Sequence, residues 1–174
     1  MHILLIGERG AGKSTLIRRL TDAWGRPVSG FITKKEAADA EGNEPVYIHP
    51  ANGPRRYGAD NLVGVCRFRH PTGYPEAFDR HAHLLAPPPP GGILVMDELG
   101  MMESGAKAFC AAALAALDGD ADSIFALKVT DTPFLNAARG HPKAVCLRIT
   151  KENREELFET ILPLIAKGPG GGAE

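Results

Sequence analysis

The chain has 174 residues, with 20 Lys and Arg against 21 Asp and Glu, and a formal net charge of −1. That length suits one domain with its own core. The near-neutral balance argues against a nucleic-acid partner, which needs a basic surface. The three cysteines are scattered without metal-ligand spacing, which is typical of a reducing compartment. No stretch has the length of a membrane span and the start of the chain does not resemble a signal peptide, so we expect a cytoplasmic protein without a membrane partner.

Strand-like and helix-like patterns alternate along the chain. This alternation predicts an α/β fold, a mainly parallel sheet with helices on both faces. Residues 35–92, dense in Pro, Gly, His and Arg, are expected to form an irregular insertion over the carboxyl edge of the sheet, with a hairpin-like excursion at 37–45. Ser104 and Thr150 are expected N-caps. The expected strands are 3–6, 28–34, 46–49, 93–96, 123–129 and 144–149, and the expected helices are 14–24, 75–86, 104–117, 132–138 and 151–167.

Residues 7–14 satisfy the pattern G-x-x-x-x-G-K-[ST], between an apolar strand and an amphipathic helix. Glycines let the backbone curl so that successive N–H groups point inward at a helix N-terminus, which creates a phosphate site. Lys13 supplies a positive charge to the β- and γ-phosphates, and the hydroxyl of Ser14 is a ligand for Mg²⁺. The expected nucleotide-binding residues here are Gly7, Glu8, Arg9, Gly10, Ala11, Gly12, Lys13, Ser14 and Thr15.

A second apolar strand, residues 93–96, ends in the acid pair Asp97 and Glu98. We expect this strand to lie beside the first one, so that its end faces the Mg²⁺ site. Successive strand residues point to opposite sides, so the two acids must play different roles. Asp97 is expected to hold Mg²⁺, and Glu98 to orient or deprotonate a water molecule that attacks the γ-phosphate.

These blocks, with 29–33, 97–103, Phe109 and 150–157, resemble the cancer-related nucleoside-triphosphatase family, small P-loop NTPases of bacteria, archaea and animals. The resemblance implies a three-layer P-loop fold over residues 1–167. Residues 168–174 are rich in glycine and are expected to form a flexible tail. The resemblance implies Mg²⁺-dependent hydrolysis of ATP, GTP, CTP and UTP to diphosphate and phosphate with little base preference. It also implies that Lys13 and Glu98 are catalytic, with Glu98 as the base, and that Asn153 and Arg154 belong to the nucleotide environment.

Two other functions fit the same motifs. A nucleotide or small-molecule kinase would use residues 50–90 as acceptor site and lid, with Arg67 and Arg69 closing on phosphate. A nucleotide-gated switch or accessory factor would hydrolyse slowly and act on a protein partner. Phosphoryl transfer also needs a further cation at the γ-phosphate, in cis or in trans. The candidates are Arg9, Arg55, Arg56, Arg67, Arg69, Lys128, Arg139 and Arg154.

Overall fold

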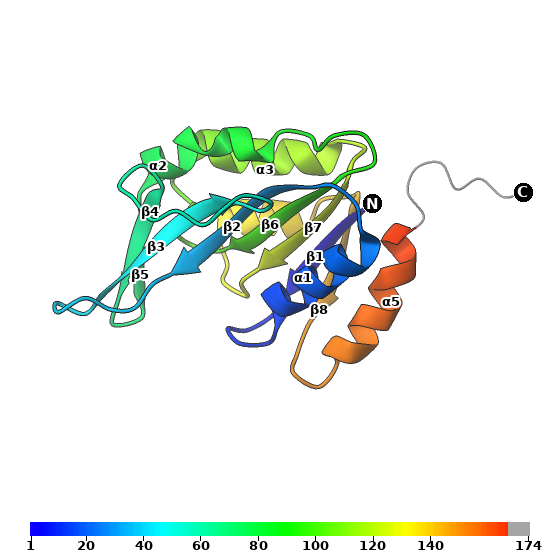
Figure 1. Cartoon of the computed structure of the whole chain (residues 1–174), viewed down its shortest axis with the longest axis horizontal. Helices are drawn as coiled ribbons and strands as arrows, with labels where there is room; N and C mark the ends of the chain where they lie inside the picture. Colours follow the sequence, from blue (N-terminus) through cyan, green and yellow to red (C-terminus); the bar gives the residue numbers. More distant parts are fainter. Residues whose placement is uncertain (167–174) are drawn as a thin grey trace, which may run out of the picture.

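The computed structural model describes residues 1–166 and contains one eight-stranded sheet in the order β5-β4-β3-β2-β6-β7-β1-β8 (Figure 1). Alternating strands and helices build it, as the sequence predicted. The strands are β1 His2–Ile6, β2 Val28–Lys35, β3 Asn43–Pro50, β4 Leu62–Arg67, β5 His70–Gly73, β6 Ile93–Leu99, β7 Asp122–Leu127 and β8 Ala144–Arg148. The helices are α1 Lys13–Trp24, α2 Pro75–Arg80, the 3₁₀ helix η1 Ala82–Leu85, α3 Lys107–Asp118, α4 Pro133–Arg139 and α5 Arg154–Ala166.

The strands that carry the two expected site motifs are not neighbours. β7 lies between β1 and β6 and pairs in parallel with both. The prediction that the acidic strand lies beside the first one is therefore wrong, because strand order depends on pairings that no local pattern contains. Both strands still end at one edge of the sheet, with Ile6 paired to Leu127 and Asp97 paired to Ala126.

The segment 35–92 is more regular than we expected. β3, β4 and β5 are antiparallel and extend the sheet sideways from β2. β2 and β3 are joined through residues 36–42, and together they form the hairpin that was expected at 37–45. β4 and β5 are joined by a tight turn in which Phe68 and Arg69 have φ of 48° and 67°, the conformation that matches the twist of a hairpin. The segment therefore widens the sheet instead of folding over its carboxyl edge.

Three predicted helices differ from the observed ones by more than one residue at an end. The helix predicted at 75–86 is split into α2 and η1, because the His81 ring binds the carbonyl of Ala77 at 2.8 Å. The helix predicted at 104–117 begins at Lys107, and Ser104 does not cap it. Instead Asp79, on α2, accepts the backbone N–H of Phe109 at 2.9 Å. The helix predicted at 151–167 begins at Arg154, and both its expected last residue and the glycine-rich tail lie outside the described residues.

Two cores lie on opposite faces of the sheet. One contains Phe31, Phe109 and Leu135 and is covered by α2, η1, α3 and α4. The other contains Leu16, Leu20 and Ile161 and is covered by α1 and α5, which pack against each other (Figure 1). Within residues 1–166 no helix is long and apolar enough to cross a membrane.

Candidate active site

The loop 7–12 connects the end of β1 to the start of α1 at the carboxyl edge of the sheet. Gly12 is the N-cap of α1 and has a φ of 101°, a left-handed conformation that favours glycine. A Cβ atom at Gly12 would also lie 3.3 Å from Cδ and Nη1 of Arg154. The loop therefore places a left-handed glycine at a helix N-terminus, which is one feature of a phosphate-binding nest.

Lys13 turns back over this loop and is only 5% exposed. Its Nζ donates to the carbonyl oxygens of Gly7 at 2.6 Å and Glu8 at 3.0 Å. The same ammonium lies 2.8 Å from Oε1 of Glu98. The loop motif and the acid pair are far apart in the sequence, and this ion pair joins them.

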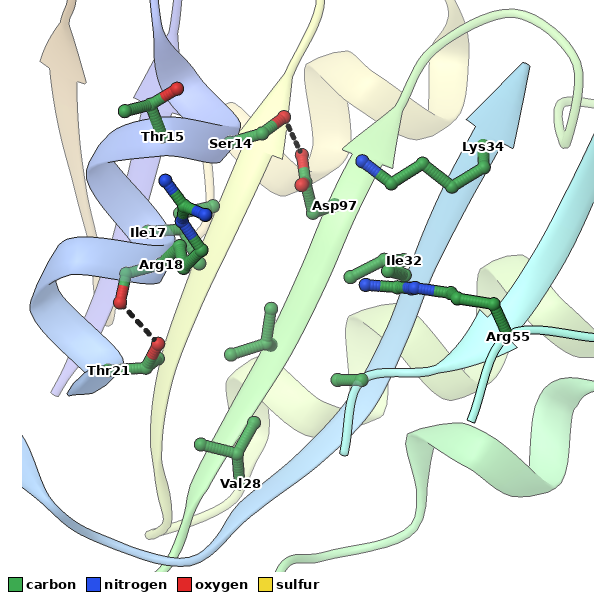
Figure 2. A pocket seen from close by; sticks show the side chains of 12 residues that line it. Ser14, Thr15, Ile17, Arg18, Thr21, Val28, Ile32, Lys34, Arg55 and Asp97 are labelled. Carbon is green, nitrogen blue, oxygen red and sulfur yellow. Dashed lines mark hydrogen bonds between the residues drawn. The ribbon is translucent and has the colours of Figure 1, made fainter. Parts of the chain in front are cut away.

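The second link between the two motifs joins Ser14 and Asp97. The Ser14 hydroxyl donates to Oδ1 of Asp97 at 2.9 Å (Figure 2). Asp97 is 7% exposed, and this burial raises the pKa of its carboxyl, as does the nearby charge of Glu98, whereas the hydrogen bond from Ser14 lowers it. A nearby positive charge would therefore favour the ionised form of Asp97.

The Ser14–Asp97 pair fits the chemistry of a Mg²⁺ site. A hydroxyl and a carboxylate oxygen, one from α1 and one from β6, converge on one point beside the loop, and Mg²⁺ prefers such oxygen ligands. Among residues 1–166 there is no group of three or more His, Cys, Asp and Glu that could hold a metal alone. Mg²⁺ is usually bound by one or two protein oxygens together with phosphate oxygens, so this donor set suits a metal that arrives with a triphosphate.

Glu98 faces two cations at the carboxyl edge. Besides Lys13, the Nζ of Lys128 lies 4.0 Å from its Oε2. Lys128 directly follows β7, and its carbonyl accepts a hydrogen bond from Arg139 at 2.6 Å. The two cations therefore hold the Glu98 carboxylate beside the loop.

A hollow of about 360 Å³ lies above the loop, and most of the predicted nucleotide-binding residues surround it or support it. Asn153 does not line this hollow. Its side chain accepts a hydrogen bond from the Thr150 N–H at 2.8 Å and donates one to the Arg148 carbonyl at 2.9 Å. These two bonds stabilise the turn before α5. The lining residues are Arg9, Gly10, Gly12, Lys13, Ser14, Thr15, Glu98 and Arg154.

The candidate cations are distributed among several places. Arg139 binds the carbonyls of Lys128 and Thr130, so it supports the loop after β7. Arg67 lies over the Phe68 ring at 5.3 Å. Arg69 lines a cleft with Glu8, Arg9 and Lys128, and Arg55 lines a groove beside α1. Of the set, Arg9 and Arg154 are the two arginines that line the hollow above the loop.

Glu103 is a buried acid that sequence reasoning did not single out. It is 2% exposed, and its carboxylate accepts the backbone N–H of Gly100. Burial raises the pKa of Glu103 to about 7. Its place in the block 97–103 is the signal that could have drawn attention to it, since this carboxylate holds the turn that follows Glu98.

The mainly parallel sheet, the glycine loop before α1 and the acid pair on β6 define a P-loop NTPase fold. The model of the NTPase family matches residues 2–162, so the chain belongs to this family. The family expected from the sequence is thereby confirmed.

Two curated relatives align over almost the whole chain. The nucleoside-triphosphatase THEP1 of Aquifex aeolicus (strain VF5) is 25% identical, and the alignment covers 96% of this chain and 100% of the relative. The cancer-related nucleoside-triphosphatase homolog of Bos taurus is 28% identical, with 92% and 94% covered.

Two solved structures share the fold. The crystal structure of THEP1 from the hyperthermophile Aquifex aeolicus superimposes with a TM-score of 0.69 at 22% identity, over 95% of this chain and 99% of that one. The solution structure of a human cancer-related nucleoside triphosphatase gives 0.65 at 22% identity, over 94% and 96%. At this level of identity the structures establish the fold and not the substrate.

Proposed function

We propose that this chain hydrolyses nucleoside triphosphates to diphosphate and phosphate, with Mg²⁺ and with little preference among ATP, GTP, CTP and UTP. The observation that carries the proposal is the convergence of Lys13, Ser14, Asp97 and Glu98 on the loop at the N-terminus of α1. The relatives named nucleoside-triphosphatases support the same activity.

Binding would depend mainly on groups that contact phosphate. Lys13 would exchange the carbonyls of Gly7 and Glu8 for the β- and γ-phosphates, which offer more negative charge. Loop N–H groups and Arg154 would add further contacts to phosphate oxygens. Because the hollow is lined by groups suited to phosphate rather than to a base edge, weak base preference is the expected result.

Hydrolysis requires a water molecule to be aligned and deprotonated. The triphosphate would compete with Glu98 for Lys13, and the released carboxylate would take the proton as the water oxygen bonds to the γ-phosphorus. The bond from that phosphorus to the bridging oxygen breaks, and the diphosphate leaves with the electron pair. Mg²⁺ held by Ser14 and Asp97 would supply charge neutralisation at the phosphate oxygens.

Compartment and domain organisation belong to the same proposal. The three cysteines, Cys66, Cys110 and Cys146, are all free thiols, which suits a reducing, cytoplasmic location. Both ends of the described chain contribute to one core, through Leu5 on β1 and Ile165 on α5. This supports residues 1–167 as one P-loop NTPase domain.

The test is phosphate release from each of the four triphosphates, with and without Mg²⁺. We expect equal amounts of diphosphate and phosphate, with rates within about tenfold of one another. Lys13→Ala should abolish release, while Lys107→Ala, at the exposed start of α3, should retain it. A strict requirement for one base, or release that begins only when a phosphoryl acceptor is added, would contradict the proposal.

A further inference from the structure

A groove of about 410 Å³ runs alongside α1 on the sheet face that α1 and α5 cover. This volume lies in the roughly 300–1,000 Å³ range of small-molecule sites. One end of the groove is formed by Ser14 and Asp97, so it adjoins the proposed Mg²⁺ site (Figure 2). Its apolar lining residues are Ile17, Val28, Ile32, Ala51 and Val95.

The apolar lining residues form the floor of the groove, and three cations surround them. Arg18 comes from α1, Lys34 from the end of β2, and Arg55 from the loop between β3 and β4. Figure 2 shows Lys34 and Arg55 on one wall, with Arg18 on the wall opposite. All three are exposed, and none forms an ion pair with any residue in 1–166. The one acid that lines the groove is Asp97, which is already bound by Ser14.

The cations that follow Arg18 and Lys34 in the sequence do form ion pairs. Arg19, next to Arg18, pairs with Glu155 at 2.7 Å. Lys35, next to Lys34, pairs with Glu44 at 2.6 Å. The fold thus supplies carboxylates to the cations beside the groove and none to those that line it, which leaves the groove with a net positive charge.

The loop that carries Arg55 is held in place by two buried polar residues. Asn61, 7% exposed, donates to the carbonyl oxygens of Arg56 at 2.7 Å and Ile48 at 2.9 Å. His49, 1% exposed, accepts the backbone N–H of Arg56 at 3.4 Å through Nδ1. Because the backbone beside Arg55 is already ordered, a ligand that binds there loses less free energy to loop ordering.

We propose that this groove binds a second small molecule beside the triphosphate, a phosphate monoester attached to a flat or apolar body. Its phosphate would lie among Arg18, Lys34 and Arg55, whose charges suit a dianion. Its body would cover Val28 and Ala51, the partly exposed apolar residues of the floor. The inference rests on the proposed function only in that the triphosphate fills the adjoining loop.

Nucleoside monophosphates are suitable probes, because each joins a phosphate monoester to a flat ring. Calorimetric titration would use protein already saturated with Mg²⁺ and a non-hydrolysable triphosphate analogue, so that the loop is occupied. We expect one further equivalent to bind. Arg55→Ala and Lys34→Ala should each weaken that binding by about tenfold or more, and Arg55→Ala should leave the affinity for the triphosphate analogue within about twofold.

Adjacent residues provide matched controls. Arg56→Ala removes a neighbouring charge that does not line the groove, and Lys35→Ala removes a charge that pairs with Glu44. Both should bind the monophosphate as the unmodified chain does. The proposal is overturned if no further equivalent binds, if Arg55→Ala and Lys34→Ala bind unchanged, or if inorganic phosphate binds equally well, since the apolar floor would then contribute nothing. Binding is read without hydrolysis, so a failure of the proposed activity would not produce any of these results.

Discussion

The ammonium of Lys13 and the carboxylate of Glu98 form an ion pair, with Nζ 2.8 Å from Oε1. This contact joins the residue expected to hold the γ-phosphate to the residue expected to activate water. A triphosphate bound in the loop would bring several negative charges to Lys13 and compete with Glu98 for it. Glu98 would then be released toward the attacking water. The ion pair therefore keeps the two groups in place before substrate arrives.

Glu98→Gln should retain triphosphate binding and lose hydrolysis by about a hundredfold or more, because an amide of the same size cannot take a proton. The measurement is single-turnover phosphate release beside equilibrium binding of a fluorescent triphosphate analogue. Glu156→Gln, on the exposed side of α5, is the matched control and should keep full turnover. If Glu98→Gln hydrolyses at the original rate, the carboxylate is not the base.

Asp97→Asn should raise the Mg²⁺ concentration needed for half-maximal phosphate release by about tenfold or more, since an amide oxygen replaces a charged ligand. Folding stability should be maintained, because burial raises the pKa of Asp97 and a neutral side chain avoids the cost of a buried charge. Asp120→Asn, an exposed residue after α3, serves as control. A Mg²⁺ titration curve that does not shift would remove Asp97 from the metal site.

The part of the site that could be predicted is the part whose residues are contiguous. The conformation of residues 7–15 could be predicted from these residues alone, because a glycine loop before a helix is a local structure. Asp97 and Glu98 were recognisable because an apolar strand precedes them, and parallel strands end at one edge. Their contacts with Ser14 and Lys13 follow from these two facts.

What could not be predicted depends on contacts between distant segments. The position of β7 between β1 and β6 is a pairing order that periodicity does not contain. The start of α3 is capped by Asp79 from another helix, whereas its own Ser104 suggested an earlier start. β4 and β5 are short and interrupted by Gly and Pro, so they lack a clear alternation of apolar residues. The groove beside α1 gathers cations from three separate elements.

Arg154→Ala should affect triphosphate binding, whereas Arg139→Ala should affect folding stability. Arg154 lies against Gly12 and lines the hollow above the loop, so Arg154→Ala should weaken triphosphate binding by about tenfold with the melting temperature unchanged. Arg139 binds two backbone carbonyls after β7, so Arg139→Ala should lower stability by about 1–3 kcal/mol. Paired binding and thermal-denaturation measurements check both, and a loss of affinity in Arg139→Ala alone would reverse the assignment.

Gly30 on β2 should not tolerate a side chain. Its φ is 103°, and a Cβ atom would lie 1.9 Å from the carbonyl oxygen of Val95 on the paired strand β6. Gly30→Ala should therefore destabilise the fold by about 3 kcal/mol or more, since β2 and β6 must separate. Gly25 also has a positive φ, 59°, but nothing lies within 4 Å of its Cβ position. Gly25→Ala should cost only about 1 kcal/mol, and equal losses in urea denaturation would contradict the steric explanation.

Glu103 should make stability depend on pH in a definite direction. Burial raises the pKa of Glu103 from the ordinary value of 4.5 to about 7 in the folded chain, so between these values the folded state holds a proton that the unfolded state releases. The contribution of Glu103 to the free energy of unfolding is therefore fully present below about pH 4.5, and it is lost as the pH rises to about 7. A difference of about 2.5 pKa units corresponds to about 3 kcal/mol.

Glu103→Gln removes the titration and keeps an acceptor for the Gly100 N–H. The free energy of unfolding is measured by urea denaturation at about pH 5 and at about pH 8. Between these two pH values it should fall by up to about 3 kcal/mol more in the original chain than in Glu103→Gln. The neighbouring charges Glu98 and Lys128 act on Glu103 in opposite directions, so Lys128→Met should raise its pKa further and shift the loss to higher pH. If the original chain and Glu103→Gln respond equally to pH, the Glu103 carboxyl is ionised throughout, and the turn after β6 holds a buried carboxylate rather than a neutral acid.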